Sequence, residues 1–235
     1  MKCVILAGGK GSRLSEYTSM IPKPMVKIGN KPILEHIINY YFSYGIKEFI
    51  VAGGYKYKVI KNYFKKRKNK YSIKIINTGY ETLTGKRIKL LEKYFTKKEN
   101  FFLTYGDGVS NINLNKLLKF HKNKKKIFTL TAVHPIARFG ELKISKGKIL
   151  KFQEKPQLLE GWINGGFFVV NTDFFKILSN KNVMLEREPM QKLISLNQIS
   201  AYQHKSFWYC MDNLRDKKVL DNLVKNKKAK WIKGK

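Results

Sequence analysis

The sequence predicts an α/β protein in which helices flank a mixed, mostly parallel sheet. Three observations support this fold class. Short apolar runs alternate with amphipathic stretches in the first half, a glycine-rich loop directly follows the first apolar run, and strand-like segments dominate the second half. Alternating strands and helices are typical of parallel sheets covered on both faces, as in Rossmann-like folds, whereas clustered strands indicate a β-rich second portion.

Apolar periodicity and turn residues define the elements of the first half. Ile33, Leu34, Ile37 and Ile38 recur with the period of a helix, and Gly45 marks the end of that helix. The predicted strands are 3–7, 48–52, 72–76 and 100–105, and the predicted helices are 32–44, 56–66 and 86–94.

The second half contains more strands and fewer helices. The predicted strands are 127–134, 141–144, 149–153, 162–170 and 199–204, and the predicted helices are 172–178, 190–196 and a last one from Asn213. An aromatic stretch at 207–209 precedes that last helix, and the residues after Lys225 are expected to form a loosely ordered basic tail. Because no repeat and no Ser/Gly linker interrupts the chain, we expect one domain over 1–235.

The composition narrows the class of protein. The net charge is +32, which can indicate a nucleic-acid partner, but only six of the 48 basic residues are Arg and the lysines are scattered through all elements. We therefore expect no specific nucleic acid. No apolar run approaches the roughly 18 residues that span a bilayer, and no signal peptide is recognisable. Cys3 and Cys210 lie far apart without metal spacing, as expected for ordinary thiols in a reducing compartment. We therefore expect the protein in the cytoplasm, without a membrane partner.

The loop after the first strand carries the strongest functional signal. It is built from Gly8, Gly9, Lys10, Gly11, Ser12 and Arg13, and Lys23 follows between two prolines. Glycines allow backbone N–H groups to approach an anion, and fixed cations complete a polyphosphate site. The spacing fits neither a Walker loop nor a dinucleotide fingerprint.

Two aspartates follow apolar segments. Asp107 comes after the strand 100–105, and Asp212 comes after a second apolar stretch and before the last helix. Mg²⁺ prefers oxygen ligands and keeps several waters, so two carboxylates and substrate phosphates are sufficient to bind it. Either aspartate could instead form a turn or a helix N-cap, and Asp212 is placed to cap the last helix.

A further group of polar residues lies in the second half. Glu154 and Lys155 end a predicted strand before a proline, and Asn164 precedes Gly165 and Gly166 inside a bulky strand. Glycine in a strand often marks the close approach of a ligand, although Glu154 and Lys155 alone could be an exposed ion pair.

Together these motifs resemble the sugar-1-phosphate nucleotidyltransferases, and in particular the branch that transfers cytidylyl to glucose 1-phosphate. The segments that carry the resemblance, in chain order, are MKCVILAGGKGSRLSE, GYK, TGYETLTGKR, TYGDGV, RFGEL, FQEKP, INGGFFV and MDNLRDK. The resemblance implies that CTP and α-D-glucose 1-phosphate give CDP-glucose and pyrophosphate, by Mg²⁺-dependent in-line attack on the α-phosphate. Another sugar phosphate or UTP, dTTP or GTP is an alternative. An inactive nucleotide sensor or a basic nucleic-acid-binding module would be a different class.

The resemblance also implies roles for single residues. The nucleotide would contact Leu6, Ala7, Gly8, Gly9, Gly11, Ser12, Arg13, Lys23, Thr82, Arg87 and Gly106. Arg13, Lys23 and Asp107 would be catalytic, Asp107 and Asp212 would hold Mg²⁺, and the sugar phosphate would contact Glu154, Lys155, Asn164 and Gly165. Residues from about 1 to 110 would then form the nucleotide-binding half, and 111–235 the sugar-phosphate-binding half. The family implies a homo-oligomer, although its longer segment after the second helix is missing between Phe64 and Tyr71.

Overall fold

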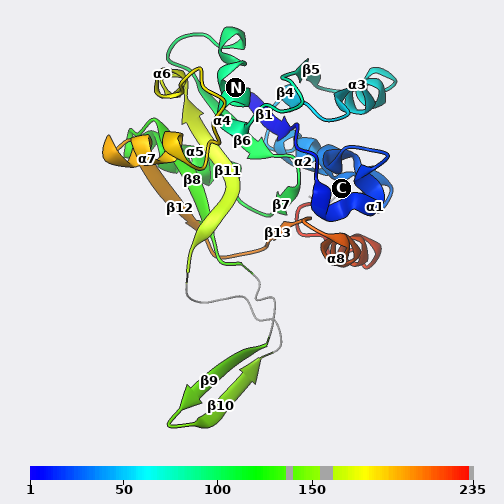
Figure 1. The fold of residues 1–235 in the computed structure, drawn as a ribbon, viewed down its shortest axis with the longest axis vertical. Helices are drawn as coiled ribbons and strands as arrows, with labels where there is room; N and C mark the ends of the chain where they lie inside the picture. The colour runs from blue at the N-terminus through cyan, green and yellow to red at the C-terminus, as the bar shows by residue number, and fades with distance from the viewer. Residues whose placement is uncertain (136–139, 154–160, 233–235) are drawn as a thin grey trace.

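A seven-stranded sheet forms the centre of the molecule (Figure 1). The computed structural model describes residues 1–135, 140–153 and 161–232. The strand order is β12-β8-β11-β6-β1-β4-β5. The strands are β1 (Lys2–Ala7), β4 (Glu48–Gly53), β5 (Ser72–Asn77), β6 (Asn100–Tyr105), β8 (Phe128–Val133), β11 (Ile163–Asn171) and β12 (Ile199–His204).

The sheet is mixed and mostly parallel, as the sequence predicts. β1 pairs in parallel with β4 and β6, β4 pairs in parallel with β5, and β12 pairs in parallel with β8. β11 alone among these strands is reversed, because it pairs antiparallel with both β6 and β8. Its register shifts between Asn164 and Phe168, next to Gly166, whose φ is +75°.

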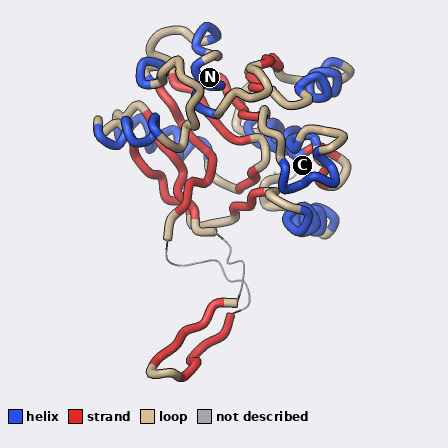
Figure 2. The backbone as a smooth tube through the Cα atoms, in the orientation of Figure 1, coloured by secondary structure: helices blue, strands red, loops and turns tan. Residues whose placement is uncertain are grey.

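Helices cover both faces of the sheet (Figure 2). The α-helices are α1 (Ser15–Thr18), α2 (Ile33–Phe42), α3 (Tyr57–Lys65), α4 (Thr84–Lys89), α5 (Leu114–Lys124), α6 (Phe174–Ile177), α7 (Glu188–Ser195) and α8 (Leu214–Lys225). Single 3₁₀ turns occupy Ser12–Leu14, Lys23–Met25 and Glu92–Tyr94. None of the helices in the described ranges has the length and apolarity to cross a membrane.

Alternate residues of β1 divide the core into two clusters. Cys3 and Ile5 pack into the cluster that includes α2, whereas Val4 and Leu6 pack into the cluster that includes α6 and α7. This follows from the two-residue period of a strand, and a strand buried on both faces is a nearly continuous apolar run.

Three small two-stranded sheets complete the fold. β7 (Gly108–Ser110) pairs with β13 (Trp208–Cys210), and β2 (Lys27–Ile28) pairs with β3 (Lys31–Pro32). The hairpin of β9 (Glu141–Ser145) and β10 (Lys148–Gln153) lies apart from the central sheet in Figure 1.

Two parts of the chain differ from the sequence-based expectation. Helix α5 was not predicted, and it begins at an N-cap, Asn113, whose side chain accepts from the Lys116 N–H at 3.0 Å. The prediction of a loosely ordered tail after Lys225 was wrong for Trp231, which is only 2% exposed. Its Nε1–H donates to His36 Nδ1 at 3.3 Å, and its ring stacks on Phe207. Burial of this one large aromatic fixes the chain at residue 231.

Candidate functional site

A cavity of about 1030 Å³ opens where the carboxyl ends of β1 and β6 meet the start of β11. Every described residue that the sequence assigns to a site lines it, namely Leu6, Ala7, Gly8, Gly9, Gly11, Ser12, Arg13, Lys23, Thr82, Arg87, Gly106, Asp107, Asn164, Gly165 and Asp212. Glu154 and Lys155 lie outside the described residues. The edge formed by strand ends is where open α/β sheets bind ligands.

The glycine-rich loop is shaped by close contacts. Gly11 has a φ of +67°, and a Cβ added to it would lie 2.7 Å from the Cβ of Lys23. The Leu14 N–H and the Thr18 hydroxyl both donate to the Gly11 carbonyl, at 2.9 and 3.1 Å. The loop therefore needs glycine at this position and is packed directly against Lys23.

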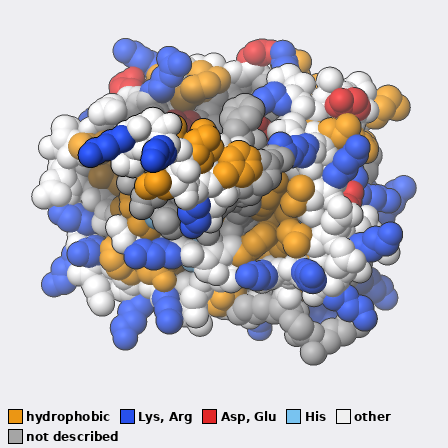
Figure 3. All heavy atoms as spheres, turned by 90° about the horizontal axis from the view of Figure 1, so that it is seen from below, with side chains coloured by type: hydrophobic (Ala, Val, Ile, Leu, Met, Phe, Trp, Pro, Cys, Tyr) orange, Lys and Arg blue, Asp and Glu red, His pale blue; other side chains and the backbone are white. Residues whose placement is uncertain are grey.

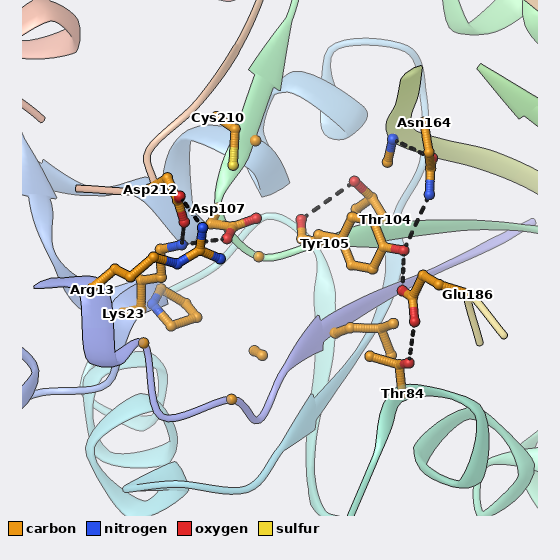
Figure 4. Close-up of a pocket in the computed structure, with 18 of the residues that line it drawn as sticks. Arg13, Lys23, Thr84, Thr104, Tyr105, Asp107, Asn164, Glu186, Cys210 and Asp212 are labelled. Atoms are coloured by element: carbon orange, nitrogen blue, oxygen red, sulfur yellow. Dashed lines mark hydrogen bonds and ion pairs between the residues drawn. The ribbon is translucent and has the colours of Figure 1, made fainter. Parts of the chain in front are cut away.

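Lys23 connects the two aspartates. Its Nζ lies 2.7 Å from Asp107 Oδ2 and 3.3 Å from Asp212 Oδ1 (Figure 4). The side chain of Lys23 is 12% exposed. Burial disfavours the ammonium, but the charge and hydrogen bond of Asp107, with a smaller contribution from Asp212, outweigh it and raise the pKa of Lys23 above its usual value. Lys23 therefore stays positively charged inside the cavity.

Arg13 and Asp212 form an ion pair at the open side of the cavity. The Arg13 side chain is 73% exposed, so it can reach a ligand that enters from solvent. Asp212 is not the cap of the last helix. That role belongs to Asn213, which forms a reciprocal capping box with Asp216. The carboxylate of Asp212 is thus free of helix capping and faces the two cations.

The pairing of β7 with β13 brings the two aspartates together. Cys210 lies opposite Gly108, and the Met211 N–H donates to the Asp107 carbonyl at 2.9 Å. Because both carboxylates contact the same ammonium, one cation of similar size can contact both of them. No cluster of three or more His, Cys, Asp or Glu side chains suited to a metal occurs in the described ranges, so such a cation would complete its shell with water and phosphate oxygens.

Arg87 lies against Gly8 of the glycine-rich loop and is 3% exposed. Its guanidinium donates to the carbonyls of Gly53, Gly79 and Thr82 and to the Thr78 hydroxyl. Burial lowers its pKa, and no carboxylate pairs with it in the described part of the chain. The contacts of Arg87 hold the segment 78–82, whose last residue, Thr82, lines the cavity.

The cavity also has polar residues that the sequence analysis missed. Tyr105, Glu186, Thr84 and Trp208 all line it, and Trp208 Nε1–H donates to the Gly165 carbonyl at 2.7 Å. Tyr105 could have been suspected, because it directly precedes Gly106 and Asp107. Glu186 lies in an irregular segment before α7 and has no sequence signal of its own. Cys210 also lines the cavity, and burial raises the pKa of its thiol.

Comparison with known proteins identifies the family. The nucleotidyl transferase family matches residues 2–217. A glucose-1-phosphate cytidylyltransferase of Salmonella typhi is 42% identical over 253 residues, which cover 98% of each chain. A probable glucose-1-phosphate cytidylyltransferase of Bacillus subtilis is 40% identical, with 92% of this chain and 93% of the relative covered. The alignment of 253 residues is longer than the chain itself, so the Salmonella relative contains residues that this chain lacks.

Solved structures agree on the fold. A putative glucose-1-phosphate thymidylyltransferase from Bacillus anthracis superposes with a TM-score of 0.77 at 17% identity, covering 100% of this chain and 97% of that one. A UDP-glucose pyrophosphorylase bound to UDP-glucose gives a TM-score of 0.74 at 18% identity, covering 96% and 98%. The match along the chain, the shared fold and the cation-lined cavity lead to one conclusion: the chain belongs to the nucleotidyl transferase family.

Proposed function

We propose that this enzyme makes CDP-glucose and pyrophosphate from CTP and α-D-glucose 1-phosphate. The observation that carries the proposal is the 42% identity to a glucose-1-phosphate cytidylyltransferase over 98% of both chains. The cavity supports it, because Arg13, Lys23, Asp107 and Asp212 converge there from four separate segments.

The reaction needs positioning and charge neutralisation and no covalent intermediate. An oxygen of the sugar phosphate attacks the α-phosphorus in line, and pyrophosphate leaves on the opposite side. The nucleophile is already an anion, so no general base is required. This agrees with a site composed of cations, carboxylates and glycines.

Each residue near the phosphates has a proposed task. The glycine-rich loop offers its backbone N–H groups to the triphosphate, and the exposed guanidinium of Arg13 neutralises the β- and γ-phosphates. Lys23 holds the α-phosphate, and its contacts with Asp107 and Asp212 orient the ammonium before the nucleotide binds. Asp107 and Asp212 would hold Mg²⁺, which would supply additional charge stabilisation for the phosphates.

The base and the sugar occupy opposite ends of the cavity in this proposal. Thr82 and Arg87 belong to the wall at the base end, and cytosine offers acceptors at O2 and N3 to donors there. Asn164 and Gly165 serve the sugar end. We also assign Glu154 to sugar hydroxyls and Lys155 to the sugar phosphate, on the resemblance alone.

The setting of the enzyme is part of the proposal. We propose a homo-oligomer in the cytoplasm without a specific nucleic acid or membrane partner. The hairpin β9–β10 supports self-association, because Leu142 pairs with Phe152 and Ile144 with Ile149, and all four side chains are exposed. Figure 3 shows basic side chains spread around one face rather than gathered in a single stripe, which supports the exclusion of specific nucleic-acid binding.

The decisive experiment measures pyrophosphate release over a grid of nucleoside triphosphates and sugar 1-phosphates with Mg²⁺. We expect the highest kcat/KM for CTP with glucose 1-phosphate. A preference for UTP, dTTP or GTP, or for another sugar, would overturn the substrate assignment and leave the reaction class in place. Light scattering of the same preparation tests the oligomer.

A further inference from the structure

One carboxylate, that of Glu186, links the two ends of the cavity. The Thr84 hydroxyl donates to Glu186 Oε2 at 2.8 Å, and the Tyr105 hydroxyl donates to Glu186 Oε1 (Figure 4). Thr84 is the first residue of α4, the helix that carries Arg87. Tyr105 is the last residue of β6 and directly precedes Gly106 and Asp107. Glu186 thus contacts the wall at the base end and the strand that delivers Asp107.

The network continues from Tyr105 to Asn164. Asn164 Nδ2 donates to the Tyr105 hydroxyl oxygen at 3.3 Å, and Asn164 Oδ1 accepts from the Gly166 N–H at 2.9 Å. These two bonds determine which way the amide faces, and they use one of the two N–H groups of Nδ2. Among the described residues nothing accepts from the second N–H of Asn164, which lines the cavity.

The direction of the hydrogen bonds depends on the charge of Glu186. An ionised carboxylate only accepts, so the hydroxyl hydrogens of Thr84 and Tyr105 both point toward it. The Tyr105 oxygen must therefore accept from Asn164. The Tyr105 ring cannot easily turn away, since a Cβ on Gly166 would lie 2.5 Å from its Cδ2 and the ring of Phe168 packs against it in a T-shaped contact.

We propose that Glu186 is a positioning residue for the second substrate: through the Tyr105 hydroxyl, its carboxylate holds the Asn164 amide with an N–H directed to an oxygen of the sugar 1-phosphate. The inference rests on the proposed function of the cavity and adds a residue to it. The ligand chemistry required is an acceptor oxygen of a sugar hydroxyl or phosphate.

A double-mutant cycle tests this relay. Glu186→Gln keeps the size of the side chain but adds an amide donor, so the Tyr105 hydroxyl can accept from it and turn its own hydrogen toward Asn164. Because Nδ2 of Asn164 can only donate, the amide must then move or flip. We expect the KM for the sugar 1-phosphate to rise about tenfold, as for loss of one to two hydrogen bonds, while the KM for the nucleotide stays within about twofold. Tyr105→Phe should give a similar rise, and the double variant should add little to either single change.

Controls separate the relay from a general structural effect. Glu188→Gln changes an exposed acid two residues away, at the start of α7, and should leave both KM values unchanged. Thermal unfolding of every variant accompanies the kinetics. Equal losses for both substrates, additive effects of the two substitutions, or an unchanged sugar-phosphate KM in Glu186→Gln would each overturn the proposal.

The substrates of the assay are chosen so that an error in the substrate assignment can be distinguished from an error in the role of Glu186. The cycle uses whichever nucleotide and sugar phosphate the unaltered enzyme turns over best, so a different preference overturns the substrate assignment without removing the test. Calorimetric titration of that sugar 1-phosphate into the enzyme with bound nucleotide provides a second readout. Its affinity should fall by the same factor in both single variants.

Discussion

The guanidinium of Arg87 lies directly against the backbone of Gly8. A Cβ added to Gly8 would be 2.1 Å from both Cζ and Nη1 of Arg87. Arg87 is held there by four acceptors from the segments around Gly53 and Thr78–Thr82, so it cannot shift without breaking hydrogen bonds. Gly9, the next residue, has nothing within 4 Å of its added Cβ.

This difference predicts opposite outcomes for two neighbouring alanines. Gly8→Ala should destabilise the enzyme by about 1–3 kcal/mol, because overpacking displaces a hydrogen-bonded guanidinium. Gly9→Ala should leave the free energy of unfolding within about 0.5 kcal/mol. Urea unfolding without nucleotide measures both. Equal stability of the two variants would show that the loop can move away from Arg87.

We expect substitutions of Asp212 and Asn213 to affect different properties: Asp212 the turnover, and Asn213 the stability. Asp212→Asn removes a carboxylate that faces Lys23 and Arg13, so turnover with Mg²⁺ should fall strongly while the melting temperature is nearly kept. Asn213→Ala removes the capping box of α8 and should cost about 1 kcal/mol of stability. Turnover and circular dichroism are measured on both. Full activity with a lowered melting temperature in Asp212→Asn would exclude a metal role.

Lys23 predicts a loss in the chemical step. Charge at the α-phosphate grows in the transition state, and the ion pairs with Asp107 and Asp212 preorganise the ammonium. Lys23→Ala should therefore lower kcat by about 10²–10³-fold. Lys27→Ala, at an exposed position of β2, is the control and should keep kcat. Single-turnover kinetics identify the affected step, and an intact chemical rate in Lys23→Ala would contradict the assignment.

We expect Trp231 to contribute to the stability of the fold. Its ring is 2% exposed, stacks on Phe207 and donates to His36. Trp231→Ala should cost about 3–5 kcal/mol, as for other buried large aromatics. Ile232, 47% exposed, should tolerate alanine with little change. Denaturant midpoints of the two variants compare them directly, and a shift confined to Ile232→Ala would be the opposite of this expectation.

We expect the burial of His121 to lower the free energy of unfolding in weak acid. Burial lowers the pKa of His121 from 6.5 to about 4, and its Nδ1 lies 2.8 Å from Thr129 Oγ1. The unfolded chain therefore binds a proton at a higher pH than the folded one does. The free energy of unfolding is therefore highest above pH 6.5, where His121 is neutral in both states. It decreases as the pH falls toward 4, by on the order of 3 kcal/mol. Urea unfolding at several pH values measures this decrease. The free energy of unfolding should fall less between pH 6.5 and 4 in His121→Gln than in the unaltered chain.

Local sequence patterns were sufficient to predict most strands of the sheet and the loops that form the site. The strands that end at Ala7 and Tyr105 are apolar runs followed by glycine, so both their type and their chain direction could be predicted. Helix α5 was missed because lysines and asparagines dilute its apolar face. Leu114, Leu117 and His121 are nevertheless buried at helical spacing behind the Asn113 cap.

Two contacts between distant segments have no local signal in the sequence. Thr84 and Glu186 are 102 positions apart and meet only because α4 packs beside the segment before α7. Trp231 is a lone aromatic among lysines, and its site between His36 and Phe207 exists only in the folded chain. Both cases depend on packing that no local pattern encodes.

The reversed direction of β11 has a consequence for how such an enzyme can change. Because β11 runs antiparallel to β8, the end of one strand lies beside the start of the other, and Ile163 is paired with Val133. The chain leaves the sheet and returns to it at neighbouring points beside the cavity. A change in the length of the intervening stretch therefore need not alter the register of the seven strands, nor the glycine-rich loop and the aspartates at their ends.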